Sequence, residues 1–525
     1  MSYTTALSSS RHAGVPLTSW AFAIRVWIAV VAALYAAFWL QLEAASSAGV
    51  CVAILAVPTR GQALEKAGFR FLATVIGVAV SIVLIGAFSQ TPTLLLLAFA
   101  VWIALCIYAA GVSDGNRAYA AVLSGYTVAI VAIEQIDAPK NVFDSGMARG
   151  AAIIVGIAAV AVVNDLLAAP NRHHGLANQL TALHRRVRRY ARTIIRRETN
   201  DPSLVIGLLR EVATLRSDIA SLATESSSGA IRSAAARNAA VALVAEIHAI
   251  RLLRVNQVSS EWLRRDGQVC ANLAALISGT RSQQTWRTPL YRCHRAAAEA
   301  GVRAFAWLVM ASIFFVLAGW SAAATSLTMI AVVVGLGATS PNPKGFTIMA
   351  LIAGPIAALL AGVLEFLLLD GATQFELLAL GIAPFVIGAA VLTTLPNQVL
   401  AALGRLLLIF VLVIVGPSNP QTYNPQTYLD VSLFVCLGAA LLLAAQTVIP
   451  PVSDEHRRQW LMAAARRELE RRPSWLSRRY SPEEAMFRDA VRIGQIAATG
   501  APAAALEEVL SLFDEAGLTR LEVKP

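Results

Sequence analysis

Single basic side chains beside or inside long apolar stretches are the residues of this sequence whose type and spacing could do chemistry. Basic groups at the mouth of a membrane pore concentrate carboxylates and repel cations. The sequence therefore predicts a path for organic anions. The basic residues expected around its cytoplasmic mouth are Arg25, Arg60, Lys66, Arg303 and Lys344, and Arg70 is expected along the same path.

Three of these arginines, Arg25, Arg70 and Arg303, each stand where an apolar run begins. Taken singly, each is explained by snorkelling, in which the stem lies along the membrane and the charge reaches the interface. Arg25 and Arg303 open comparable runs, RVWIAVVAALYAAFW and RAFAWLVMASIFFVLAGW, in the front and back of the chain. If these regions are repeats, the two arginines form a symmetric pair near the mouth.

Arg405 differs because it lies about two turns inside a predicted span, between VLAALG and LLLIFVLVIVG. A charge at that depth is costly unless it faces a polar cavity or a partner. The sequence leaves two interpretations open: a functional position facing the path, or a shorter helix that starts at Arg405.

Carboxylates are few in the apolar stretches. Asp165, in AVVNDLLAAP, and Glu365, in GVLEFLLLD, are the candidate proton carriers or arginine partners, and an interfacial position is the alternative for both. All seven histidines lie outside the apolar stretches. A proton carrier within the membrane therefore has to be a carboxylate.

Two tyrosines, Tyr119 and Tyr126, lie among small residues in AYAAVLSGYTVAI. A tyrosine offers an aromatic substrate a ring face, and its hydroxyl can donate a hydrogen bond to a carboxylate. We include both in the predicted path. Close helix packing through the small residues is the alternative explanation of this stretch.

Membrane helices are the elements that must position these side chains. The chain has 525 residues, of which 57% are hydrophobic and 14% charged, against about 25% charged in soluble domains. Many apolar runs approach the ~20 residues that span a hydrocarbon core, and their length indicates helices. We predict an all-α polytopic membrane protein. The expected spans lie near 21–42, 46–57, 69–88, 94–111, 117–134, 149–168, 303–320, 323–339, 346–369, 375–394, 398–416 and 429–449.

The predicted spans form two groups of six that look like internal repeats. In Ala53–Phe88 an apolar run breaks at a proline, continues through a short loop that carries Arg60, Lys66 and Arg70, and resumes. In Met329–Leu369 a second run breaks in the same way, at SPNPKG. An even number of spans in each group makes the two repeats parallel, related by an axis along the membrane normal.

Polar segments flank and separate the two groups. We predict a cytoplasmic N-terminus (1–18), a first six-helix half (19–170), an Arg-rich helical domain (171–301), a second six-helix half (302–450) and a helical tail (451–525). Lysines and arginines collect in alternate connections, so the positive-inside rule places both termini and the Arg-rich domain in the cytoplasm. Helices outside the membrane are expected near 175–198, 202–223, 229–255, 258–278, 453–472, 481–499 and 502–517.

Several classes of function lack their sequence signature. The chain shows no Walker A motif, no nucleophile–base constellation and no metal-ligand spacing, and its five cysteines are scattered. We therefore expect no enzyme, no metal and no cofactor. The Arg-rich domain carries no nucleic-acid recognition motif, and we expect it to face anionic lipid or to extend the basic mouth.

The pattern VPTRG…K…FR…T..G, the stretch AYAAVLSGYTVAI and the break SPNPKG resemble the fusaric acid resistance family of aromatic carboxylic acid (para-hydroxybenzoic acid) efflux transporters. The resemblance covers nearly the whole chain. It implies export of aromatic or other hydrophobic organic acids across a bacterial inner membrane, often beside a periplasmic membrane-fusion adaptor protein. One half also resembles a subunit of the plant aluminium-activated malate transporters, which implies a fused pseudo-dimer around a central path.

We therefore expect an inner-membrane efflux transporter for organic, and in particular aromatic, carboxylates. We expect proton coupling, contact with membrane lipid and, as an option, a homo-oligomer. A passive organic-anion channel and a membrane-anchored, lipid-interacting scaffold are the alternatives.

Overall fold

The computed structural model describes a protein built from helices. Apart from one antiparallel pair of two-residue strands, β1 (Arg11–His12) and β2 (Val15–Pro16), the regular elements of the described residues are helical. The predicted all-α class is therefore confirmed. The described residues are 11–12, 15–57, 60–167, 173–196, 201–256, 259–319, 323–340, 342–470 and 480–522.

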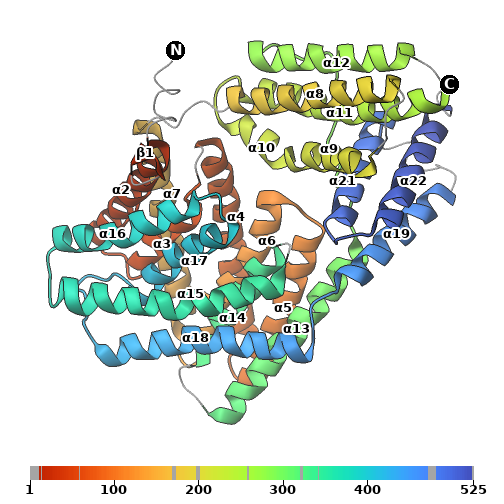
Figure 1. Cartoon of the computed structure of the whole chain (residues 1–525). Helices are drawn as coiled ribbons and strands as arrows, with labels where there is room; N and C mark the ends of the chain where they lie inside the picture. Colours follow the sequence, from red (N-terminus) through yellow and green to blue (C-terminus); the bar gives the residue numbers. More distant parts are fainter. Residues whose placement is uncertain are drawn as a thin grey trace. The chain divides into compact units, whose positions relative to one another are not determined.

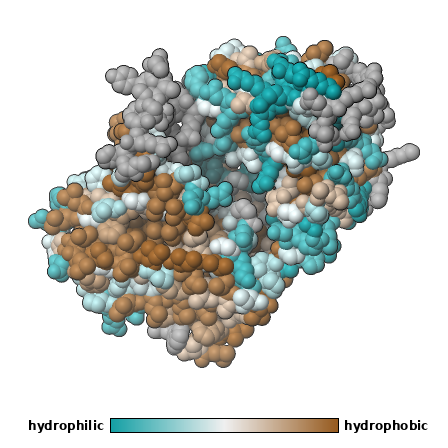
Figure 2. Space-filling model, in the orientation of Figure 1, coloured by the Kyte–Doolittle hydropathy of each residue, from teal (hydrophilic) through white to brown (hydrophobic). Residues whose placement is uncertain are grey.

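The chain divides into two compact units, each assembled from two separate segments. Unit 1 comprises Met1–Ala169 and Ala297–Pro451, and unit 2 comprises Pro170–Ala296 and Val452–Pro525. Figure 2 shows brown, apolar side chains over much of the visible face of unit 1 and many teal, hydrophilic ones over that of unit 2. Unit 1 is thus the membrane-embedded part.

Unit 1 contains the apolar helices of both halves (Figure 1). The first half consists of α2 (Leu17–Trp39), α3 (Ala45–Leu55), α4 (Arg60–Phe88), α5 (Pro92–Gly111), α6 (Gly115–Val128) with its π-helical extension η1 (Ala129–Ile133), the short η2 (Pro139–Asn141), and α7 (Val142–Leu166). The second consists of α13 (His294–Ala318), α14 (Ala323–Ala338), α15 (Pro343–Val363) with its π-helical extension η4 (Leu364–Leu369), α16 (Phe375–Thr393), α17 (Gln398–Val415) and α18 (Pro425–Val448).

Ten helices of the described residues are long and apolar enough to cross a membrane, which confirms a polytopic membrane protein. The other two apolar helices, α3 and α14, are shorter, and each is second in its half. The halves use matching packing pairs: α3 packs on α7 as α14 packs on α18, and α4 packs on α6 as α15 packs on α17. These pairs support the predicted repeat, although the twelve-span layout stays a prediction.

The halves also pack on each other through matching helices. In one direction α2 packs against α16 and α3 against α17, while in the other α6 packs against α14. Both short helices therefore lie where one half contacts the other. A side chain placed along α3 is consequently close to both halves.

One predicted loop is wrong. The residues from Arg60 to Arg70 belong to α4, a single helix of 29 residues, and the prediction started this span nine residues too late, at 69. Their sequence, RGQALEKAGFR, is rich in strong helix formers, and charged side chains alone do not end a helix. Arg70 consequently lies well inside α4 and not at the start of a span.

Unit 2 packs around the buried helix α11. Its helices are α8 (His173–Ile195), α9 (Pro202–Thr214), α10 (Arg216–Ser221), η3 (Leu222–Thr224), α11 (Gly229–Asn256), α12 (Ser259–Ser278), α19 (Asp454–Glu470), α21 (Pro482–Ala497) and α22 (Ala503–Glu522). Helix α11 packs against α8 and α12 and also against α21 and α22. The predicted Arg-rich domain and the predicted tail therefore contribute to one unit.

Candidate anion-binding site

Three basic side chains of neighbouring helices are spaced along the short helix α3. The ammonium group of Lys66 donates to a main-chain carbonyl in the last turn of α3. One turn earlier, Arg70 Nε donates to Cys51 Sγ at 3.1 Å, and another turn earlier Arg149 Nη1 donates to Ser47 Oγ at 3.3 Å. The three contacts cover about 10 Å of helix at 1.5 Å per residue. We call Lys66, Arg70 and Arg149 the cation ladder.

Arg70 is the most deeply buried member of the ladder, with 1% of its surface exposed. Besides Cys51, its guanidinium donates through Nη1 to the hydroxyl of Tyr119 at 2.7 Å. Among the described residues no carboxylate pairs with it. Removing a charge from water costs several kcal/mol even after relaxation. Neutral acceptors leave this charge uncompensated, so the position suits an incoming anion.

Tyr119 of α6 contacts two members of the ladder. Its hydroxyl accepts from Arg70, and its ring centroid lies 5.2 Å from the ammonium nitrogen of Lys66. The ring face is therefore occupied by one cation and the hydroxyl oxygen by another. The phenolic proton stays available to a bound carboxylate.

Tyr126 lies two turns further along α6 and is also buried, with 3% exposed. Its ring lies beside Gly335 of α14, where an added Cβ would be 3.5 Å away. The neighbouring small residue Gly125 faces α5, with an added Cβ only 3.1 Å from Ile103. Small residues of α6 thus serve helix packing, the alternative weighed for this stretch, while Tyr119 contacts the cations.

Arg149 is a member that the sequence prediction missed. It lies seven residues after the first residue of α7, Val142, whereas the predicted span began at Arg149 itself. Its Nε is buried and has no hydrogen-bond partner among the described residues. Arg149 interacts electrostatically with Arg70 and Glu134, but it forms no direct ion pair with Glu134 in the described structure. A lone cation inside an apolar run, the signal that drew attention to Arg405, could have identified it.

Arg405 brings a further cation from the second half. Helix α17 starts at Gln398 and is capped by Asn397, whose Oδ1 accepts from the amide of Val399 at 2.9 Å. The alternative of a helix beginning at Arg405 is therefore wrong. Arg405 is exposed, and its charge repels that of Lys66, so it lies near the Lys66 end of the ladder.

The remaining predicted cations occupy different surroundings. Arg25 is buried with its guanidinium 5.7 Å from the centroid of a phenylalanine ring in the same helix. Arg303 is ion-paired with Glu299 at 3.0 Å and also donates to a main-chain carbonyl after α18. Lys344 is exposed in the first turn of α15, and the side chain of Arg60 lies outside the described residues. A shared basic mouth for these four stays a prediction.

The two candidate proton carriers differ in burial. Asp165 is exposed near the end of α7, which fits the interfacial alternative. Glu365 is 4% exposed and lies in the π-helical segment η4. Single π-helical turns inside α-helices occur frequently at functional sites. The Glu365 carboxylate is therefore buried within the protein, while its depth in the membrane and its role in proton transfer stay predictions.

The second half lacks the counterpart of the ladder. When the halves are aligned on the glycines of their two breaks, Gly354 occupies the place of Arg70 and Ala350 the place of Lys66. Both residues are buried, and Gly354 lets Cys436 of α18 approach to 3.2 Å from an added Cβ. Helix packing replaces cations there, so the site is asymmetric although the packing pairs match.

The apolar helices define a multi-pass membrane protein, in which the buried Arg70 has no carboxylate partner among the described residues. The chain belongs to the fusaric acid resistance protein family, whose model matches residues 19–266 and 257–512. The resemblance seen in the sequence is therefore confirmed. No solved structure matches the chain.

Curated relatives match over most of their length. The uncharacterized transporter YdhK of Escherichia coli strain K12 is 23% identical, over 86% of this chain and 77% of that protein. The p-hydroxybenzoic acid efflux pump subunit AaeB of Edwardsiella tarda is 25% identical, over 83% of this chain and 77% of its own. AaeB of Musicola paradisiaca is also 25% identical, over 83% of this chain and 76% of that protein.

Proposed function

We propose that this chain exports organic carboxylates, in particular aromatic ones, across the bacterial inner membrane by proton-coupled secondary transport. The observation that carries the proposal is the cation ladder, in which Arg70 is buried without a carboxylate partner among the described residues. Family membership and the relatives named as efflux pump subunits support the direction and the substrate class. A periplasmic membrane-fusion adaptor protein is part of the proposal, and so is a homo-oligomer.

The contacts of the ladder indicate how a carboxylate is held. The acceptors that Lys66, Arg70 and Arg149 now use are a carbonyl, a thiol, a phenol and a serine hydroxyl, all neutral. A carboxylate forms charge-assisted bonds to the same donors, which are about twice as strong. The ring of Tyr119 adds apolar contact for an aromatic substrate. Successive cations of similar kind let the anion leave one position for the next, as multi-site pores require.

The orientation proposed from the positive-inside rule sets the direction. It places the Lys66 end of the ladder towards the cytoplasm and the Arg149 end towards the outside. Single cysteines at Ser227, in unit 2, and Thr373, an exposed residue after η4, test it in a Cys-free chain. An impermeant thiol reagent added to intact cells should label the Thr373 position alone, and labelling at Ser227 contradicts the orientation.

Coupling to protons is proposed through Glu365 and Asp165, and the burial of Glu365 supports it as the first choice. Coupling is not required by energetics alone. Moving one negative charge outward down the membrane potential releases about 2.3 kcal/mol per 100 mV, and a tenfold concentration ratio costs about 1.4 kcal/mol. A passive anion channel with the same ladder therefore remains the second candidate, because a row of unpaired cations also serves conduction.

Uptake of labelled aromatic acids into everted inner-membrane vesicles tests the proposal, with p-hydroxybenzoate as the first substrate. The proposal expects uptake that an uncoupler abolishes, and that Glu365→Gln reduces under a pH gradient while substrate counterflow persists. Uptake that follows membrane potential alone and ignores the pH gradient supports the channel. Absence of uptake for the whole panel, with the protein present in the membrane, overturns both and leaves the scaffold.

A further inference from the structure

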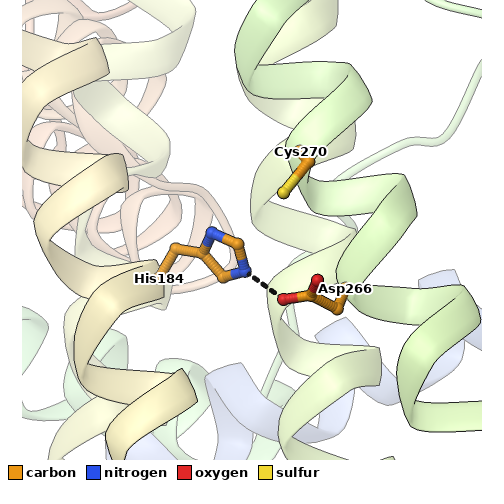
Figure 3. Close-up of side chains that lie close together, drawn as sticks. All are labelled: His184, Asp266 and Cys270. Atoms are coloured by element: carbon orange, nitrogen blue, oxygen red, sulfur yellow. Dashed lines mark hydrogen bonds and ion pairs between the residues drawn. The ribbon is translucent and has the colours of Figure 1, made fainter.

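Three side chains with metal-binding atoms converge inside unit 2, and a buried carboxylate lies beside one of them. His184 of α8 lies with Nε2 2.9 Å from Asp266 Oδ1 of α12 and 3.5 Å from Glu246 Oε2 of α11. Cys270 stands one turn after Asp266 on α12, and the ligand atoms of His184, Asp266 and Cys270 all lie within 4.8 Å of one another. Figure 3 shows the sulfur directed towards the gap between α8 and α12.

Glu246 supplies an independent sign that a ligand is expected at this point. Its side chain is 0% exposed. Its Oε1 accepts from Trp262 Nε1 at 3.4 Å, whereas Oε2 is buried and has no hydrogen-bond partner among the described residues. An unsatisfied buried carboxylate oxygen is costly. This oxygen lies 3.5 Å from His184 Nε2, an atom that carries at most one hydrogen and that lies closer, at 2.9 Å, to Asp266 Oδ1.

We propose that this cluster binds one divalent transition-metal ion of the zinc class. The donor set would be His184 Nε2, Glu246 Oε2, Asp266 Oδ1 and Cys270 Sγ. An imidazole nitrogen, carboxylate oxygens and a thiolate are the ligands that Zn²⁺ takes in proteins, usually four in a tetrahedron. Helix bundles build metal sites from side chains that facing helices project inward, and here α12 would supply two ligands one turn apart while α8 and α11 supply one each.

Charge supports the same assignment. Two carboxylates and one thiolate carry three negative charges, and the divalent ion together with the guanidinium of Arg188 carries three positive ones. Arg188 donates to both oxygens of Asp266, at 2.5 and 2.6 Å, and its Nη2 lies 3.5 Å from Cys270 Sγ. Outer partners of this kind orient the ligands of metal sites. The occupied site would therefore be neutral.

The site is also accessible and has a structural consequence. Cys270 is exposed at the residue level, so an ion has a route from solvent to the buried oxygens. An ion held by these residues would tie α8, α11 and α12 together. Sequence spacing gave no sign of it and predicted no metal, because only Asp266 and Cys270 share a helix. The inference is independent of the transport function proposed above.

The test uses the full-length chain in detergent, stripped with a chelator and titrated with Co²⁺ as a spectroscopic probe. The proposal expects one Co²⁺ per chain, the intense visible bands of tetrahedral Co²⁺ and a near-ultraviolet thiolate-to-metal band, all removed by one equivalent of Zn²⁺. Cys270→Ser should abolish the thiolate band and weaken Co²⁺ binding about tenfold or more. Cys293→Ser, a cysteine of unit 2 outside the cluster, is the matched control and should behave as the wild type.

Glu246→Gln distinguishes a metal site from a hydrogen-bonded network, since it keeps the size of the side chain and removes its charge. The metal site predicts Co²⁺ binding at least about tenfold weaker with the protein still folded, and a Zn²⁺-dependent rise of the unfolding temperature that the variant loses. A wild-type chain with no thiolate band, or with the same band in Cys270→Ser, overturns the proposal. So does Co²⁺ binding that Glu246→Gln leaves unchanged.

Discussion

Buried arginines in the two units have opposite surroundings. In unit 2, Arg265 is 2% exposed and ion-paired with Glu483 at 2.9 Å and Glu261 at 2.8 Å. Burial opposes ionisation of Asp489, but Arg520 and Arg492 outweigh it and hold the pKa of Asp489 below its usual range. In unit 1, Arg70 is as deeply buried as Arg265 and has only neutral acceptors among the described residues.

On the function proposed above, this difference separates charges that stabilise the fold from charges that bind a ligand. The charge of a buried arginine that pairs with a carboxylate is neutralised, and removing the arginine leaves the carboxylate buried and unpaired. A buried arginine without a matching carboxylate raises the energy of the empty protein and favours whatever anion arrives. The comparison therefore predicts stability defects in unit 2 and transport defects in unit 1 from the same chemical change.

Arg265→Gln should give the largest effect, a loss of roughly 3–5 kcal/mol in the free energy of unfolding, because Glu483 is left buried and unpaired. Denaturant unfolding of the purified protein measures it. The neighbouring Arg264 is the matched control, because it also pairs with Glu261 but its side chain is 54% exposed. Its Gln variant should lose no more than about 1 kcal/mol, and an equal loss in both would break the comparison.

Arg70→Gln should reduce the rate of p-hydroxybenzoate uptake into everted vesicles about 30-fold or more, the equivalent of 2 kcal/mol or above for a desolvated charge contact. Protein level and unfolding temperature should hold, because no carboxylate of the described structure is stranded. Arg303→Gln is the control in the same unit, since Arg303 is ion-paired with Glu299. If Arg303→Gln lowers uptake as much as Arg70→Gln, the ladder is not what sets the rate.

Arg149→Gln should reduce uptake about tenfold, or roughly 1.4 kcal/mol, because one position of the ladder is lost while the others remain. Ser47→Ala removes only the neutral hydroxyl that Arg149 now uses, and uptake should stay within about threefold of wild type. The ratio of the two effects, measured in the same vesicles, shows whether the charge or its present partner matters. A larger loss for Ser47→Ala would mean that the contact is structural.

Arg405→Gln should lower uptake about threefold at low salt and less at high salt, since an exposed charge acts mainly by attracting the anion. Lys344→Gln, an exposed cation in the first turn of α15, should have a smaller effect. Initial rates at two ionic strengths check both variants. A loss for Arg405→Gln that does not respond to salt would place its side chain within the ladder.

Acid should affect unit 2 gradually. The pKa of Asp489 is lowered in the folded protein, so its contribution to stability is present above the unfolded pKa of about 3.9 and is lost as pH falls through the lower folded value. Unfolding temperature should therefore fall below about pH 4. In Asp489→Asn the same acid range should produce a smaller drop, measured by intrinsic fluorescence. An equal drop in both proteins would assign the acid sensitivity to other carboxylates.

Local patterns in the sequence were sufficient for the helices. Long apolar runs and amphipathic stretches predicted the spans and the helices of unit 2, because both signals depend on residues close in sequence. The helix predicted over 202–223 is divided into α9 and α10, and no proline or glycine marks the break between them. The loop predicted between Arg60 and Arg70 was wrong, because the charged side chains of this segment were interpreted as the end of a helix.

The site depended on which helix faces meet, which the sequence does not state. Arg70 and Tyr119 were both singled out, but their hydrogen bond needed the packing of α4 on α6. Gly77 allows that packing, since an added Cβ would lie 2.6 Å from Thr127 Cβ. Arg149 was missed because its span was started too late. The cluster around His184 joins three helices, so no spacing in the sequence reveals it.

The order of the segments along the chain has a consequence for biosynthesis. Helix α11 is made before the second half of unit 1, whereas α21 and α22, which complete its packing, are made afterwards. Until then Arg251 and Arg265 lack Asp514 and Glu483, their partners from the later segment. A ribosome that has translated only the first 480 codons has therefore produced unit 2 without α21 and α22. Unit 2 can therefore be completed only after every helix of the second half of unit 1 has been synthesised.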